Sequence, residues 1–186
     1  LQTGSPAINA GNPSITTPTT DITGAARGTA PFDLGAYEGE VSVCPTILYV
    51  DQNIGSSGNG ATWATALNTL DEALTIAHNC PGLTTINVAA GTYKPTLKPY
   101  ENGTPITTLD DRDVTFHLPN GVALYGGFQN GGGTRNAALY PTILSGDFND
   151  DDVVSGSGST LSITGNTENA YHVVLSVSDG ATTLLD

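Results

Sequence analysis

The apolar segments that follow residue 80 are all short, and each is bounded by Gly, Asn, Asp or Pro. They are residues 85–89, 114–118, 122–125, 142–145, 161–163, 172–177 and 182–185. Short segments rich in Val, Ile, Thr and Leu, separated by turn residues, are typical of β-strands. The 23 Gly and 11 Pro of the 186 residues supply the turns. This part of the chain therefore predicts successive short strands without helices between them.

One helix is expected ahead of these strands. Its apolar residues recur at helical spacing, at Leu67, Leu70, Ala73, Leu74 and Ala77. Such a stripe predicts a helix near 64–79 that buries one face, with a stop at 79–82 where the chain reads Asn-Cys-Pro-Gly. An earlier strand pattern lies at 47–51.

A β-sandwich and a solenoid can both hold such strands. Sandwiches are built from hairpins, and tight two-residue hairpin loops are scarce here. The connections at 94–113 and 126–141 instead run ten or more residues, which suits loops projecting from successive coils. A lone helix with one apolar stripe could cover the open first coil. The sequence therefore favours an all-β solenoid.

Residues 1–40 carry turn residues and almost no periodicity, so they cannot bury enough surface to fold alone. We expect three parts: 1–40, a linker at 41–46, and a second unit at 47–186. The chain has no initiator Met and no signal peptide, and we interpret it as a processed product or a part of something longer.

The chain is strongly acidic, with 18 Asp plus Glu against 5 Lys plus Arg and a formal net charge of -13. Such a surface repels nucleic-acid phosphate and anionic lipid, so neither is an expected partner, and divalent cations are the natural counter-ions. No apolar run approaches the roughly 20 residues of a membrane-spanning helix, so no membrane insertion is expected.

Two cysteines, Cys44 and Cys80, occur in a Lys-poor chain of extracellular character. An even count in this setting predicts one disulfide between them. The alternative is two reduced thiols that are buried separately.

Five motifs carry a resemblance to a known family. In chain order they are 63–67 (WATAL), 70–74 (LDEAL), 86–95 (INVAAGTYKP), 120–128 (NGVALYGGF) and 141–147 (PTILSGD). Together they resemble the N-terminal part of secreted right-handed parallel β-helix proteins, the pectin-lyase-like repeat proteins of Bacteroidetes-type bacteria. Separately, 4–12 and 32–38 resemble the segment that closes the C-terminal end of such β-helices. The resemblance implies the tail of one β-helix followed by the capping helix and first coils of the next.

The resemblance also implies a function. We expect an extracellular structural or adhesive module of a large bacterial surface or secreted protein, repeated in tandem or self-assembling head-to-tail into filaments. Expected partners are other copies or modules, surface carbohydrate, or a host or cell-surface protein. The alternative is a carbohydrate-active β-helix, a polysaccharide lyase or glycoside hydrolase, whose catalytic coils lie outside these residues. No lyase or hydrolase motif occurs here, so this segment itself is expected to be non-catalytic, with no cofactor other than calcium.

The densest polar cluster is the acidic run from 147 to 152. Asp147, Asn149 and Asp151 alternate, so a loop there could direct three oxygen ligands at one calcium ion. The match to an EF-hand loop is poor, and a solvated acidic loop is the alternative. Residues 110–113 form a weaker second candidate.

Isolated aromatic and imidazole residues complete the candidates. Structural roles are expected for His78, His117 and His172, which are far apart in the sequence. A further set could form a sugar-stacking platform or pack in structural positions: Trp63, Tyr93, Tyr100, Tyr125 and Tyr140.

Overall fold

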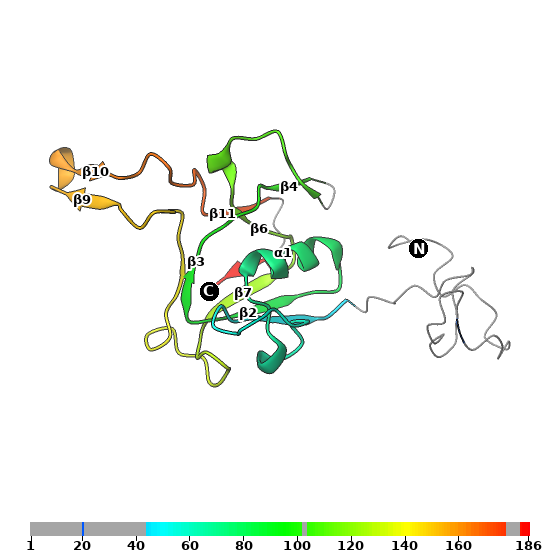
Figure 1. Ribbon diagram of the computed structural model, residues 1–186. Helices are drawn as coiled ribbons and strands as arrows, with labels where there is room; N and C mark the ends of the chain where they lie inside the picture. Colours follow the sequence, from blue (N-terminus) through cyan, green and yellow to red (C-terminus); the bar gives the residue numbers. More distant parts are fainter. Residues whose placement is uncertain (1–19, 21–43, 102–103, 178–182) are drawn as a thin grey trace. The chain divides into compact units, whose positions relative to one another are not determined.

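Figure 1 shows the chain as a computed structural model, which describes Thr20 and residues 44–101, 104–177 and 183–186. Residue contacts divide the chain into two units, Leu1–Val43 and Cys44–Asp186. Apart from Thr20, the expected closing segment at 1–40 lies outside the described residues, as does the first half of the expected linker at 41–46.

The described residues of the second unit form short elements. The strands are β1 (Ile47–Val50), β2 (Thr85–Ala89), β3 (Gly91–Tyr93), β4 (Tyr100–Glu101), β5 (Thr104–Pro105), β6 (Phe116–Leu118), β7 (Ala123–Phe128), β8 (Thr142–Leu144), β9 (Val153–Ser155), β10 (Ser162–Thr164), β11 (Val174–Ser176) and β12 (Leu184–Leu185). The helical elements are α1 (Leu70–Asn79) and the 3-10 turns η1 (Trp63–Thr65), η2 (Asp111–Asp113) and η3 (Gly158–Thr160).

The largest sheet has four parallel strands in the order β1-β2-β7-β12. Its register places Leu48 beside Ile86, and Ile86 beside Leu124. All three side chains are buried, because alternate residues of each strand face the core. The parallel register therefore places aliphatic side chains of neighbouring strands beside one another in one apolar layer.

The outer edge of β1 is closed by the segment that follows it. The backbone N–H of Tyr49 donates to the carbonyl of Gly60, and the N–H of Leu67 donates to the carbonyl of Tyr49. The N–H of Asp51 in turn donates to the carbonyl of Leu67. These bonds satisfy the backbone groups that an edge strand otherwise exposes.

The expected all-β, right-handed parallel β-helix is wrong. The described residues form five small sheets, of which only one has more than two strands, and no solenoid is found among them. Two of the sheets, β4–β5 and β9–β10, are antiparallel, while β3–β8 and β6–β11 are parallel pairs. A solenoid repeats the same strands in every turn. Here the long connection at 94–113, which was expected to be a loop, holds β4 and β5, which pair with each other, and the architecture is mixed α/β.

The helix begins later than the expected residue 64. Leu67 pairs with β1, so its backbone is not available to a helix. Thr69 then forms a capping box, in which the N–H of Glu72 donates to Thr69 Oγ1 and the N–H of Thr69 donates to the Glu72 carboxylate. The helix buries Leu70, Ala73, Leu74 and Ala77 and packs against β1 and β6.

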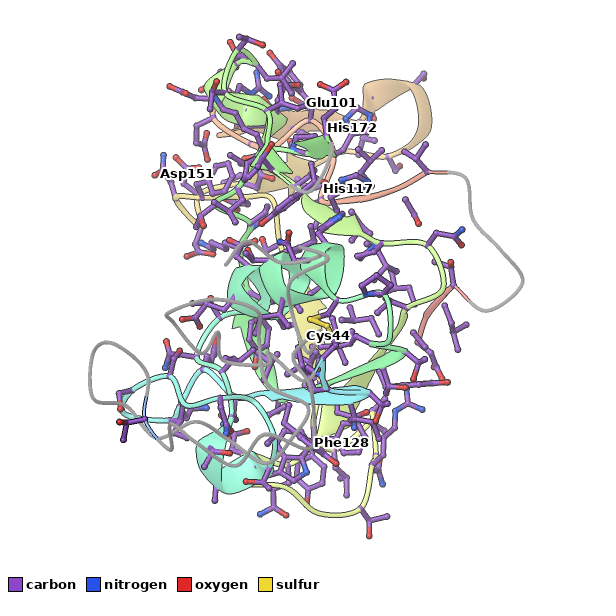
Figure 2. The ribbon with its side chains drawn as sticks, turned by 90° about the vertical axis from the view of Figure 1, so that its right-hand side faces the viewer. Cys44, Glu101, His117, Phe128, Asp151 and His172 are labelled. Atoms are coloured by element: carbon purple, nitrogen blue, oxygen red, sulfur yellow. A yellow bond between two sulfur atoms is a disulfide. The ribbon has the colours of Figure 1, made fainter. Side chains whose placement is uncertain are left out.

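Cys44 and Cys80 form a disulfide, the pairing that the sequence predicts, with their Cα atoms 5.2 Å apart (Figure 2). The bond joins the residues before β1 to the end of α1. Cys80 belongs to the main apolar core, which also contains Leu48, Val50, Leu70, Leu74, Ile86, Val88, Phe116, Leu118 and Leu124. Within the described part of the chain, no helix is both long and apolar enough to cross a membrane.

Candidate metal centre

Two segments that flank the β9–β10 hairpin lie side by side. The N–H of Ala170 donates to the carbonyl of Gly146 at 2.9 Å, and Asn169 Nδ2 donates to Asp152 Oδ2 at 2.8 Å. Gly165 approaches so closely that a Cβ there would lie 2.4 Å from the carbonyl oxygen of Asp151. Residues 146–152 and 165–170 therefore form a pair of loops that are hydrogen-bonded to each other.

Three carboxylates gather between these two segments. Asp147, Asp151 and Glu168 each offer one oxygen atom, and the three oxygens lie within 4.8 Å of one another. Asp151, labelled in Figure 2, is exposed, and the other two are half-buried. Like charges this close repel one another unless a cation or a proton is shared among them. Hard divalent cations such as calcium take several carboxylate and carbonyl oxygens as ligands.

Two neighbouring oxygen atoms accept no hydrogen bond within the described structure. Glu168 Oε1 and Asn169 Oδ1 are both buried and have no donor. A buried acceptor without a partner is costly, and natural structures contain few of them. A cation bound at the three carboxylates would supply Glu168 with the positive partner that it lacks.

The first segment holds Asp147 in its ionised form. Desolvation acts to raise the pKa of the Asp147 carboxyl, but the backbone N–H groups of Asp152, Asp151 and Asp150 oppose this effect. The N–H of Asp151 lies 3.3 Å from Oδ1, and the N–H of Asp152 lies 3.3 Å from Oδ2. Lys94 adds a favourable charge, and the pKa of Asp147 ends below its ordinary value.

Basic side chains fix both segments from outside the carboxylate cluster. Lys94 Nζ contacts Asp150 Oδ2 at 2.7 Å and the carbonyl of Phe148 at 3.1 Å. Arg112 donates from Nε to the carbonyl of Asn169 at 2.7 Å, and its guanidinium lies over the ring of Tyr171. Asp150 is thus committed to Lys94, and Arg112 anchors the segment that carries Glu168.

The structure brings together two of the three residues proposed from the sequence. Asp147 and Asp151 belong to the cluster, whereas Asn149 is exposed and is not part of it. Glu168 was missed, because it lies beyond the β9–β10 hairpin and no local spacing connects it to Asp147. The sequence signal for the approach of these two segments was the pair of glycines Gly146 and Gly165. Glycines alone are not specific enough to identify Glu168 as a third ligand.

The weaker acidic candidate at 110–113 forms the 3-10 turn η2. Its carboxylates are used locally: Asp110 Oδ1 accepts the N–H of Arg112, and Asp113 Oδ2 accepts the N–H of Asp110. Asp111 is exposed, 3.5 Å from Lys98 Nζ. Among the described residues this segment does not form a group of metal-ligating side chains.

The aromatic and imidazole candidates occupy separate places. The ring of Trp63 contacts Tyr49 and Phe128, at centroid distances of 4.9 and 5.3 Å. Of the tyrosines proposed for a sugar-stacking platform, Tyr93 and Tyr100 are buried.

His78 and His117, far apart in sequence, meet at a ring-centroid distance of 4.7 Å. His172 is exposed. A scan against protein-family models and searches of the curated proteins and of the solved structures find no match to this chain.

Proposed function

We propose that this chain is an extracellular structural or adhesive module of a bacterial surface or secreted protein, and that it is not itself an enzyme. The observation that carries the proposal is the Cys44–Cys80 disulfide, which closes the core between β1 and α1. Disulfides persist in oxidising compartments and are rare in the cytosol, so this one is consistent with an extracellular protein. The motif order from Trp63 to Asp147, which resembles secreted bacterial proteins, supports the same location.

Two of the polar side chains that could act chemically support a non-catalytic role. Asp150 is held by Lys94. His78 Nε2 bonds to the backbone carbonyl of His117. A general acid or base needs a free atom facing substrate, and these groups are engaged within the fold.

One sheet edge supports an adhesive role. The outer edge of β12 pairs with no strand among the described residues, and Leu184 and Leu185 are 43% and 52% exposed. Exposed strand edges bind partners by accepting an additional strand. Head-to-tail pairing of two copies would need the edge of β1, which is already closed by Gly60 and Leu67. The edge of β12 can therefore accept an added strand, from a further part of the same polypeptide or from another protein, whereas the edge of β1 cannot.

Two measurements test the proposed role. Intact producing cells are treated with a membrane-impermeant amine reagent, and modification of this protein on intact cells is the expected result. The purified protein is then incubated with plant and microbial polysaccharides, and reducing ends and unsaturated uronate products are measured. Labelling only after lysis would overturn the location, and product formation above a heat-inactivated control would overturn the non-catalytic role.

The carboxylate cluster supports calcium as a structural ligand of this module. An ion at Asp147, Asp151 and Glu168 would join the segments 146–152 and 165–170 and offset their repulsion. Because the ion would bind only the folded chain, calcium at 100 times the dissociation constant would add about 2.7 kcal/mol, or roughly 5–10 °C in Tm.

Calorimetric titration and thermal unfolding in EDTA, calcium or magnesium test the ion. The variant Glu168→Gln should lose most of the calcium effect, while Glu101→Gln, an exposed acid on β4, should retain it. Absence of binding heat, or an equal Tm shift in both variants, would show that the cluster is a solvated acidic surface.

A further inference from the structure

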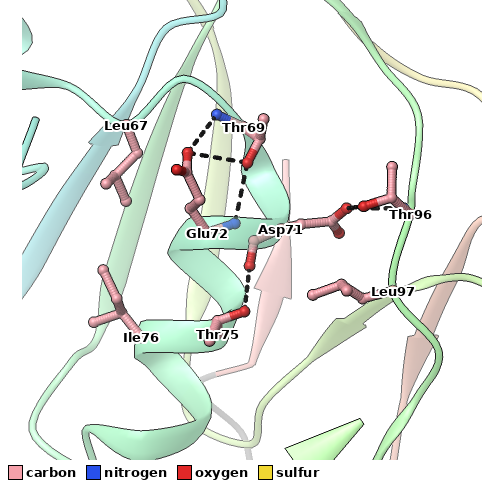
Figure 3. A pocket seen from close by; sticks show the side chains of 8 residues that line it. All are labelled: Leu67, Thr69, Asp71, Glu72, Thr75, Ile76, Thr96 and Leu97. Atoms are coloured by element: carbon pink, nitrogen blue, oxygen red, sulfur yellow. Dashed lines mark hydrogen bonds between the residues drawn. The ribbon is translucent and has the colours of Figure 1, made fainter. Parts of the chain in front are cut away.

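A groove of about 480 Å³ runs along the first turns of α1 (Figure 3). Leu67, Ile76 and Leu97 contribute its apolar walls, and Asp71 and Glu72 contribute its charges. Its volume falls within the usual range of small-molecule sites, which are largely apolar with a few oriented polar groups. The groove is separate from the carboxylate cluster of the candidate metal centre.

Asp71 is an unusual lining residue for an apolar groove, because its charged side chain is buried and only 8% exposed. Figure 3 shows its side chain reaching from α1 toward Thr96. Thr96 donates two hydrogen bonds to this carboxylate, from its backbone N–H at 2.8 Å and from its hydroxyl, and both reach Oδ2. The other oxygen, Oδ1, accepts no hydrogen bond from the described residues. One carboxylate oxygen therefore remains available to a donor in the groove.

Among the described residues that line the groove, no basic side chain offsets this charge. Both charged residues that line it are acids. Lys94 and Lys98 are equally near to Thr96 in sequence, and both are engaged elsewhere. Lys94 Nζ contacts Asp150 Oδ2 at 2.7 Å, and Lys98 Nζ donates to the carbonyl of Leu109 at 2.7 Å and faces Asp111. A partly buried carboxylate without a cation is incompletely compensated, since desolvation disfavours its charged form.

We infer that this groove binds a small aliphatic ammonium ion, with the ammonium at Asp71 Oδ1 and the alkyl chain against Leu67, Ile76 and Leu97. The charge of the lining selects a cation, and its apolar walls select a hydrocarbon chain over a compact hydrated ion. An ammonium group carries three donors and can satisfy Oδ1 while keeping its remaining donors toward Glu72 or solvent. The inference does not depend on the proposed structural or adhesive role.

The test compares n-hexylammonium with n-hexanol, which has the same chain without the charge. Each is titrated at 150 mM NaCl, and backbone amide chemical shifts are followed by two-dimensional NMR. Saturable shifts are expected at the amides of Leu67, Thr69, Thr96 and Leu97. Because a charge-assisted bond is about twice as strong as a neutral one, hexylammonium should bind about tenfold more tightly than hexanol.

Asp71→Asn is the informative variant. The asparagine oxygen can still accept both hydrogen bonds from Thr96, so the fold is retained while the charge is lost. Hexylammonium affinity should fall about tenfold, to the level of hexanol. Glu101→Gln removes an equal charge from exposed β4 and should leave affinity unchanged, which separates the site from attraction to the acidic surface as a whole.

Three results would overturn the inference. They are equal affinity for hexanol and hexylammonium, unchanged affinity in Asp71→Asn, and shifts that do not saturate. The first and third use only the native chain, so they decide the question even if the variant is unstable. Loss of calcium binding or of the extracellular location would not affect this result.

Discussion

The carboxylate of Asp71, in the first turn of α1, accepts hydrogen bonds from both the backbone N–H and the hydroxyl of Thr96, 25 residues later in the chain. Burial acts to raise the pKa of Asp71 above its ordinary value, and the bonds from Thr96 only partly oppose this. A single side chain thus fixes the start of α1 against the segment that leaves β3. The contact matters for the fold as well as for the groove.

Thr96→Val tests this contact, since it removes the hydroxyl and keeps the backbone donor. A hydrogen bond to a buried charged group contributes about 1.5–3 kcal/mol, and the remaining N–H bond should limit the loss to about 1–2 kcal/mol. Urea unfolding measures the change. Thr92→Val, an exposed position in β3, should stay within about 0.5 kcal/mol of the native chain. Equal effects of the two substitutions would show that the hydroxyl contributes nothing specific.

The disulfide should be the largest single contribution to stability. It joins residues separated by 36 positions, and the chain-entropy relation gives about 3–4 kcal/mol for a loop of this length. The double variant Cys44→Ala with Cys80→Ala should lose about this amount in urea unfolding. Reduction of the native chain should give the same midpoint as the double variant. A loss below about 1 kcal/mol would mean that the packing of α1 on β1 and β6 holds these residues without the bond.

Local elements could be predicted from the sequence because they depend on nearby residues. The segment 85–89 was expected as a strand and is β2, and the segments 142–145 and 172–177 contain β8 and β11. Val, Ile and Thr between turn residues favour extended backbone wherever the strand packs. The apolar stripe of α1 was also predicted correctly, because it depends on the spacing of nearby residues. Only its start was misplaced, because the pairing of Leu67 with β1 is a tertiary contact.

The architecture and the third carboxylate could not be predicted in this way. Whether β4 and β9 pair locally or join a longer sheet depends on contacts that periodicity does not record. Alternation along one loop identified Asp147 and Asp151, but it also selected Asn149, which is exposed. Glu168 reaches the cluster only because hydrogen bonds from Ala170 and Asn169 join two distant segments. Such convergence is visible only in three dimensions.

A pH-dependent stability follows from two histidines between α1 and β6. His78 Nε2 lies 2.8 Å from the carbonyl oxygen of His117, and His117 Nδ1 accepts the backbone N–H of Tyr100 at 2.9 Å. Burial lowers the pKa of both imidazoles. Since their unfolded pKa is about 6.5, the unfolded chain binds more protons as the pH falls below that value. Stability should be full above about pH 6.5 and should decrease as the pH falls toward the folded pKa.

Urea unfolding between pH 7.5 and 5 measures this slope, in a range above the titration of most carboxylates. The double variant His78→Gln with His117→Asn retains a donor and an acceptor near the original atoms but does not titrate, so its stability should be nearly constant over this range. His172→Gln, at an exposed position, is the matched control and should keep the native slope. An unchanged slope in the double variant would assign the pH dependence to other groups.

Gly132 is required where the chain passes over the only tryptophan. Its φ is +98°, and a Cβ there would lie 2.4 Å from Trp63 Cδ1. Gly131 has a similar φ of +77° but faces open space. Alanine at either position must adopt a left-handed backbone conformation, which destabilises the folded chain by about 1 kcal/mol. Only Gly132→Ala must also displace the Trp63 ring from Tyr49 and Phe128, which should add about 1–3 kcal/mol.

Fluorescence distinguishes the two alanine variants, because Trp63 is the single tryptophan of the chain. Gly132→Ala should shift the native emission to longer wavelength as the ring becomes more solvated, and should lower the urea midpoint further than Gly131→Ala. Gly131→Ala should keep the native emission, since its backbone N–H can still donate to Asp51. Identical spectra and midpoints for the two variants would mean that the ring moves aside without cost, and that Tyr49, Trp63 and Phe128 do not form a rigid cluster.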